Sequence, residues 1–357
     1  MRVVQLIDSL DIGGAERMAV NIANGLAECN HFSGLVSTRK EGELKEKISD
    51  KVSYLFLQRQ KTLDIGAVLR LKNYLKQHKI EIIHAHSSSY FVAVLAKVFY
   101  PSVKIVWHDH YGKSEYLAER PAGVLKAFKF GIHAVISVNE QLAKWAREVV
   151  GFKKACYVSN FAYLEDDKVL LTKLKGTEGK RILCLANYRP QKDHKNLLRA
   201  FEQLHEQHPD WTLHLVGKNF NDAYADEIAH LIKEATLEDR VFMYGSRTDT
   251  KNILEQATIG VLASESEGLP LALLEYGLMK LPVVVTKVGE CSTVVKNNEN
   301  GLLVPPKNNE LLCVAMSTLI AENDKRISLG AQLYETVQNH YGQNQYLQRL
   351  ITIYEQA

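Results

Sequence analysis

Residues 181–196 read RILCLANYRPQKDHKN, and this stretch decides the fold. It opens with a short apolar run, residues 181–186, that has the length and composition of a buried strand. A basic turn follows, and an amphipathic helical pattern then begins with Leu197 and Leu198. A strand, turn and helix that start this far into the chain predict a second sheet, separate from the sheet of the N-terminal half.

Short β-branched runs alternate with helical patterns on both sides of this stretch, which is typical of parallel sheets with crossover helices. The chain therefore has the pattern of an α/β protein with two Rossmann-like, doubly wound domains, whose strand ends face a central cleft. The expected strands cover residues 2–7, 32–37, 52–57, 81–84, 103–108 and 134–138, and then residues 181–186, 212–216, 241–244, 259–263 and 282–286.

Length and composition agree with two soluble domains. The chain has 357 residues, of which 46% are hydrophobic and 24% charged, and no run is long enough to span a membrane. Its five scattered cysteines are typical of reduced thiols in a cytoplasmic protein. The polar, Gly-punctuated residues 164–179 are the expected linker between the domains.

Charge is unevenly distributed along the chain. Residues 1–170 hold 24 Lys and Arg against 18 Asp and Glu, a balance of +6, which leaves −3 for the remainder. A basic front half suits an anionic membrane surface or a phosphorylated acceptor, and equally suits an ordinary solvated surface.

Several loops after expected strands carry small residues that let a ligand approach the backbone. Gly13 and Gly14 open a long helix, whose first amides could hold a phosphate. Gly217 and Gly245 follow two later strands and leave room for a base or a ribose. Each glycine is a weak signal alone, because glycine also ends strands and forms plain turns.

Arg189 and Lys192 leave the end of the strand at residues 181–186, just before a helix. A guanidinium and an ammonium group at this position could bind a diphosphate, and the alternative is a solvated basic turn.

Two glutamates eight positions apart form the most informative pair, in the segment EGLPLALLE at residues 267–275. Gly268 and Pro270 precede a helical pattern, so the loop can contact a polar ligand with its amides. Glu267 would lie on the loop and Glu275 about one and a half turns into the helix, so that each reaches a different part of the ligand. A solvated acidic loop before an ordinary helix is the alternative.

Histidines at the ends of two expected strands, in His84-Ala85-His86 and His108-Asp109-His110, could ligate a metal. The sequence offers no further ligands at a diagnostic spacing and no Asp-x-Asp motif in a suitable loop. We therefore expect no metal site, and expect His108 to form hydrogen bonds at the mouth of the site.

Taken together, these residues resemble the retaining glycosyltransferases of family 4, which have the two-domain GT-B architecture. The resemblance covers nearly the whole chain in the right order. It is carried by Gly13-Gly14-Ala15-Glu16, His108, Arg189 with Lys192, Gly217, Gly245, Glu267-Gly268-Leu269-Pro270 with Glu275, Gly289, and Asn300-Gly301-Leu302-Leu303-Val304-Pro305.

The resemblance implies a role for each of these positions. Arg189 and Lys192 would stabilise the leaving nucleotide diphosphate, and Glu275 would accept the ribose hydroxyls. Glu267 would hold the donor sugar together with the backbone amides after Gly268, in the donor-binding loop Gly268-Leu269-Pro270.

From the other domain, Gly14 would approach the diphosphate and His108 would contact a sugar hydroxyl. One departure from the family pattern is Glu290 in place of a second glycine, with Thr293 in place of a glutamate, which puts any contact assigned to that loop in doubt.

The resemblance also implies the domain roles. Residues 1–163, with a C-terminal crossover helix at about 340–357, would form the acceptor-side domain, and residues 180–339 the nucleotide-sugar domain. Residues 119–130 mix basic and apolar side chains, which fits either a surface helix at a membrane or a core-packed helix with exposed lysines.

The expected activity is metal-independent transfer of a hexose, without a cofactor, from a nucleotide-diphosphate sugar, with uridine as the expected base. The acceptor would be a glycan or a lipid-linked precursor in surface polysaccharide biosynthesis, at the cytoplasmic side of the membrane. No nucleic-acid partner is expected. The alternatives are a non-catalytic nucleotide-sugar or glycan-binding subunit, and a metal hydrolase built on the four histidines.

Overall fold

The computed structural model describes residues 1–112, 114–161, 163–164 and 170–357. The chain divides into two compact units: unit 1 comprises residues 1–160 and 343–357, and unit 2 comprises residues 161–342. Residues 165–169 of the expected linker, and residue 162 just before it, lie outside the described residues.

Unit 1 is a seven-stranded parallel sheet in the order β3-β2-β1-β4-β5-β6-β7. The strands are β1 (Arg2–Ser9), β2 (Phe32–Lys40), β3 (Ser53–Phe56), β4 (Ile82–His86), β5 (Lys104–Asp109), β6 (Ala134–Ser137) and β7 (Ala155–Tyr157). The α-helices are α1 (Gly14–Glu28), α2 (Ile65–Gln77), α3 (Tyr90–Phe99), α4 (Gly123–Phe128), α5 (Glu140–Trp145) and α13 (Gln343–Gln356).

Unit 2 is a six-stranded parallel sheet in the order β10-β9-β8-β11-β12-β13. The strands are β8 (Arg181–Leu185), β9 (Thr212–Val216), β10 (Val241–Gly245), β11 (Ile259–Leu262), β12 (Val283–Thr286) and β13 (Leu302–Val304). The α-helices are α6 (His194–Gln207), α7 (Ala223–Glu234), α8 (Thr250–Glu255), α9 (Leu271–Leu278), α10 (Cys291–Val294), α11 (Asn309–Ala321) and α12 (Asn323–His340).

The predicted α/β class with two doubly wound parallel sheets is confirmed. Central strands are buried on both faces, as the continuous apolar runs predict. In unit 1, Val4 and Leu6 belong to one apolar cluster and Ile7 to another, because successive side chains point to opposite sides of the sheet. The sequence did not predict β7 and β13, which are three residues each and too short for a periodic pattern to show.

Each sheet has one point where the strand order reverses, between β1 and β4 in unit 1 and between β8 and β11 in unit 2. Loops that leave neighbouring strands at such a point run to opposite faces of the sheet and open a crevice at its carboxyl edge. The glycine loop follows β1, the Arg189–Lys192 turn follows β8, and the Glu267 loop follows β11. The fold therefore places these loops where doubly wound sheets bind ligands.

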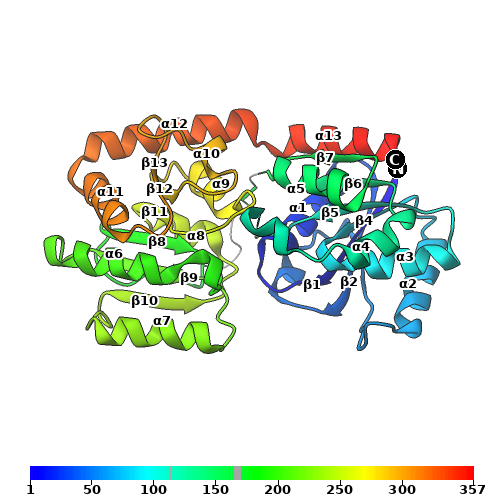
Figure 1. The fold of residues 1–357 in the computed structure, drawn as a ribbon, viewed down its shortest axis with the longest axis horizontal. Helices are drawn as coiled ribbons and strands as arrows, with labels where there is room; N and C mark the ends of the chain where they lie inside the picture. The colour runs from blue at the N-terminus through cyan, green and yellow to red at the C-terminus, as the bar shows by residue number, and fades with distance from the viewer. Residues whose placement is uncertain (113, 162, 165–169) are drawn as a thin grey trace. The chain divides into compact units, whose positions relative to one another are not determined.

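The chain ends in unit 1 although unit 2 precedes it. Helix α13, red in Figure 1, belongs to this unit, where it packs against α1, and buries Tyr346, Leu347, Leu350 and Tyr354. A Cβ atom at Gly25 of α1 would lie 2.7 Å from the Leu347 side chain, so the glycine permits close packing of α1 against α13.

Candidate functional site

The loops after β8 and β11 are bonded to each other at the carboxyl edge of unit 2. The Lys192 ammonium lies 2.5 Å from Oε1 of Glu267, and the Ser264 hydroxyl donates to the same oxygen at 2.7 Å. The Glu265 amide donates to the Gln191 carbonyl at 2.8 Å. Glu267 is only 5% exposed, so the structure joins two predicted site residues in a largely desolvated ion pair.

The turn that carries Lys192 is held by Asp193. This residue has a φ of 46°, and its carboxylate accepts a hydrogen bond from the Asn196 amide at 3.2 Å, which caps the first turn of α6. Arg189, three residues before Lys192, is exposed, and its guanidinium lies 4.9 Å from the centre of the Phe220 ring. The two predicted cations therefore differ: Lys192 contacts Glu267, whereas Arg189 is exposed and lies against Phe220.

The second predicted glutamate, Glu275, is also 5% exposed and lies in α9. Pro270 occupies the N-cap position of this helix, one residue earlier than the first-turn position that the sequence suggested, and Leu269 before it is buried. The segment therefore carries two buried carboxylates on one loop and helix. A buried carboxylate needs polar partners, and the hydroxyl groups of a bound ligand can be among them.

Gly289 supports this loop from the side of β12. It has a φ of 47°, and a Cβ atom there would lie 2.1 Å from the Glu267 carbonyl oxygen. The Glu290 amide donates to the Gly268 carbonyl at 2.9 Å, while its carboxylate accepts from the Thr293 hydroxyl at 2.8 Å. The loop that departs from the family pattern thus holds Glu267 and Gly268 through its backbone.

Gly217 and Gly245 are glycines for different structural reasons. A Cβ atom at Gly217 would lie 2.1 Å from the Ala186 carbonyl oxygen, so this glycine allows the ends of β8 and β9 to touch. Its amide donates to the Gly245 carbonyl at 3.0 Å. Gly245 has a φ of 67°, and a Cβ atom there would meet no atom within 4 Å, so of the two glycines only Gly245 leaves open space.

In unit 1, Gly14 begins α1, and a Cβ atom there would meet no atom within 4 Å. Behind the glycine loop, Asp8 accepts hydrogen bonds from Thr38 at 2.5 Å and Ser88 at 2.6 Å. Nη2 of Arg59 lies 3.6 Å from the same carboxylate, and the Arg59 side chain is 4% exposed. We did not predict Asp8, Thr38, Ser88 and Arg59 as a group, although Asp8 and Thr38 lie near the carboxyl ends of β1 and β2, and Arg59 and Ser88 follow β3 and β4.

Four histidines of unit 1 form a stack at the ends of β4 and β5. His86 and His108 are cross-strand partners, and the His108 ring lies 5.1 Å from His84, 5.3 Å from His86 and 3.9 Å from His110. Burial lowers the pKa of His84 and of His110 to about 3, and burial with neighbouring imidazoles holds the pKa of His86 and His108 well below 6.5. The cluster is neutral at pH 7.

His108, the predicted site residue, is fully buried. Both of its ring nitrogens are buried without a hydrogen-bond partner among the described residues. His108 therefore contacts His84 and His86 and is not accessible to solvent.

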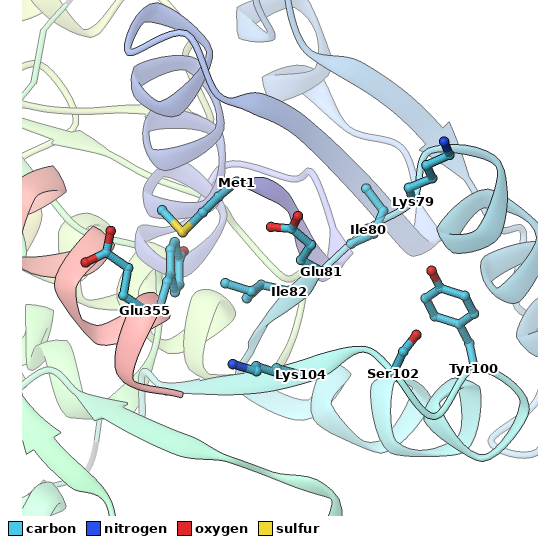
Figure 2. Close-up of a pocket in the computed structure, with 10 residues that line it drawn as sticks. Met1, Lys79, Ile80, Glu81, Ile82, Tyr100, Ser102, Lys104 and Glu355 are labelled. Carbon is cyan, nitrogen blue, oxygen red and sulfur yellow. The ribbon is translucent and has the colours of Figure 1, made fainter.

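A pocket of about 410 Å³ lies elsewhere in unit 1, at the amino ends of the strands (Figure 2). Glu81 and Ile82 at the start of β4, Lys104 at the start of β5, and Glu355 of α13 line it. No predicted site residue lines this pocket. Since parallel sheets bind ligands at their carboxyl ends, we do not assign the site to it.

Two family models match the chain: Glycosyltransferase Family 4 over residues 12–166 and Glycosyl transferases group 1 over residues 171–336. An uncharacterized glycosyltransferase of Haemophilus influenzae is 24% identical over 315 residues, covering 86% of this chain and 87% of the relative. The amylovoran biosynthesis glycosyltransferase AmsD of Erwinia amylovora is 22% identical over 334 residues, covering 91% of this chain and 92% of the relative.

Solved structures share the fold. Sucrose-phosphate synthase from Thermosynechococcus elongatus superposes with a TM-score of 0.81 at 19% identity, covering 100% of this chain and 99% of the other. HepE of Anabaena, in complex with UDP and glucose, gives a TM-score of 0.79 at 18% identity with 100% coverage of both chains. The fold is therefore GT-B. This chain belongs to the group 1 glycosyltransferases of family 4, as the sequence pattern predicted.

No helix formed by the described residues is both long and apolar enough to cross a membrane.

Proposed function

We propose that the protein transfers a hexose from a UDP-sugar to a glycan or a lipid-linked acceptor in surface polysaccharide biosynthesis, with retention of configuration. The carrying observation is the bonded pair of loops that joins Lys192 to Glu267 and continues into Glu275. The relative AmsD acts in amylovoran biosynthesis, and the HepE structure contains UDP and glucose, which supports the donor and acceptor classes.

The proposed chemistry depends on where charge develops. Breaking the bond between sugar and diphosphate places negative charge on the leaving phosphate, and fixed cations stabilise it there. Lys192 would exchange part of its contact with Glu267 for the diphosphate, while the exposed Arg189 guanidinium would close on it from the rim. These cations take the role that a metal has in other transferases, so we propose metal-independent catalysis.

The remaining residues bind the donor. Glu275 would accept the ribose hydroxyls, and Glu267 with the amides of Gly268 and Leu269 would hold the sugar. Gly217 and Gly245 would admit the base, and Pro270 would fix the start of α9. In unit 1, the open backbone at Gly14 would admit a phosphate.

Donor binding tests this assignment. A thermal-shift screen across nucleotide sugars should show stabilisation by a UDP-sugar, because a ligand that binds the native state raises Tm by mass action. Glu275→Ala should then weaken donor binding by about tenfold to 100-fold in calorimetry, the loss of one or two charge-assisted hydrogen bonds. The matched control is Glu265→Ala, since Glu265 lies in the same loop but pairs with Lys307 at 3.1 Å.

Unchanged donor affinity and turnover in Glu275→Ala would refute the assignment. Tight donor binding with neither transfer nor slow donor hydrolysis in the wild type would instead identify a non-catalytic binding subunit.

For the acceptor side, we propose a peripheral contact between unit 1 and an anionic membrane. In α4 and the turn after it, Leu125 is buried whereas Val124 is 57% and Phe130 77% exposed, next to Lys126 and Lys129. Exposed apolar side chains beside lysines suit a lipid surface. Phe130→Ser should reduce sedimentation with anionic vesicles, and binding equal to that of the wild type would contradict the contact.

A further inference from the structure

The four stacked histidines have no part in the donor contacts proposed above. Their geometry points to a use of its own. The ring nitrogens that His84, His86 and His108 can offer as ligands lie within 4.8 Å of one another, and all three rings are fully buried. We propose that these three histidines bind a divalent transition-metal ion, with Zn²⁺ as the expected occupant, in a structural site inside unit 1.

Unsatisfied nitrogens are the first observation that supports the site. Nε2 of His84 and both ring nitrogens of His108 are buried without a hydrogen-bond partner among the described residues. A buried polar atom without a partner destabilises the folded state, so a native structure normally supplies one. One ion at the centre of the three rings would give a partner to the bare nitrogens of His84 and His108.

His84 and His86 each use one ring nitrogen to contact a side chain outside the cluster, and this contact fixes the orientation of the ring. Nε2 of His86 lies 2.9 Å from Oε1 of Gln5, an acceptor, so this nitrogen carries the proton. Nδ1 of His86 is then the acceptor nitrogen, which lies 2.9 Å from Nε2 of His110 and is the candidate ligand. Nδ1 of His84 lies 2.6 Å from the Tyr354 hydroxyl, which leaves Nε2 as the free nitrogen of that ring. Partners of this kind, which hold the non-ligating nitrogen, are characteristic of histidine metal sites.

The backbone sets the distances. His84 and His86 alternate on one strand and face the same side, and His86 is the register partner of His108 on the next strand. Nitrogens on a tetrahedral Zn²⁺ lie about 3.3 Å apart, so the rings need only small side-chain rotations to converge. Nε2 of His110 lies 2.9 Å from Nδ1 of His86, so His86 would exchange this contact for a bond to the ion.

Burial also decides what the ion would do. A catalytic zinc keeps one position open to water, whereas these three rings are fully buried. The site would therefore fasten β4 to β5 and, through the bond from His84 to Tyr354, to α13. It supports no hydrolase, and it is independent of the proposed transfer.

The test uses untagged full-length protein. We expect about one zinc per chain by elemental analysis after addition of ZnCl₂ and desalting. A chelator-treated sample should gain about 5–10 °C in Tm when zinc is restored at 100 times its Kd. Co²⁺ should give the visible absorption of a tetrahedral nitrogen site. A folded wild-type protein that retains less than about a tenth of an equivalent, with no gain in Tm, overturns the proposal.

Variants locate the ion. His84→Leu should abolish both the retained zinc and the gain in Tm, and His86→Gln, whose amide can still bond to Gln5, serves if the first variant does not fold. The control is His214→Leu, because His214 is fully buried in unit 2 and lies outside the cluster. This control should keep one zinc per chain. A full equivalent of zinc with an unchanged Co²⁺ spectrum in His84→Leu or His86→Gln would also overturn the proposal.

Discussion

Substitution of Gly289 by alanine should displace the loop that carries Glu267. The added Cβ atom would lie 2.1 Å from the Glu267 carbonyl oxygen and 2.7 Å from that of Gly268, whereas ordinary contacts begin at 3.4 Å. These neighbours are backbone atoms, so the loop must move by about 1 Å, and misplacement on that scale costs about 100-fold in rate. The φ of 47° adds about 1 kcal/mol of strain.

A matched variant separates the clash from the strain. Gly179→Ala, at a φ of 79° with nothing within 4 Å, should lose only the strain component of stability. The assays are donor affinity by calorimetry, the rate of donor turnover, and Tm. We expect Gly289→Ala to lose about 100-fold in turnover and Gly179→Ala to match the wild type. Equal Tm losses in the two variants, with donor turnover intact in both, would refute the account of Gly289 as the support of the Glu267 loop.

Three further predictions concern unit 2 and the edge of unit 1. Burial lowers the pKa of His194 from 6.5 to about 4, so its contribution to stability is present above pH 6.5 and is lost as the pH falls toward 4. His194→Phe should reduce the loss of stability at acid pH. The measurement is the free energy of unfolding in urea at several pH values between 4 and 6.5, and a pH dependence equal to that of the wild type would contradict this. Arg120 donates to both oxygens of buried Asp109, at 2.6 and 2.9 Å, so Arg120→Lys should lower the free energy of unfolding by about 2–3 kcal/mol through loss of the planar fork. An unfolding midpoint equal to the wild type would exclude that. Gly217→Ala, whose Cβ would lie 2.1 Å from the Ala186 carbonyl, should lower Tm, while Gly14→Ala, with no atom within 4 Å, should leave Tm nearly unchanged.

The arrangement of the loops was predictable because it follows from a general rule. Strands that alternate with helices form parallel sheets, and their carboxyl ends collect the polar residues that follow each strand. This placed Arg189, Lys192 and Glu267 on the same edge without any knowledge of contacts. The direct bond between Lys192 and Glu267 was not predictable, since it joins residues 75 positions apart and depends on the packing of two loops.

The histidine cluster shows a second limit. The sequence shows that His84 and His86 alternate on a strand, but whether His108 faces them depends on the register between β4 and β5. Register follows from the packing of the whole sheet, and a shift of one residue would turn His108 to the other face. Gly289 was likewise visible as a glycine after a strand, but its contact with the Glu267 carbonyl required the three-dimensional structure.

The position of α13 has a consequence for how the chain is made. Tyr354 of α13 forms a hydrogen bond with His84, 270 positions earlier, and Lys154 donates to the carbonyl of Gln356. The surface of unit 1 that α13 covers therefore stays exposed until this helix has been synthesised. Unit 2 has all of its strands within residues 161–342, so it can fold before residues 343–357 have been synthesised. A nascent chain that stalls before residue 343 would expose the apolar side of α1 to chaperones. Of the two units, the one that begins later in the sequence is therefore the first that can be complete.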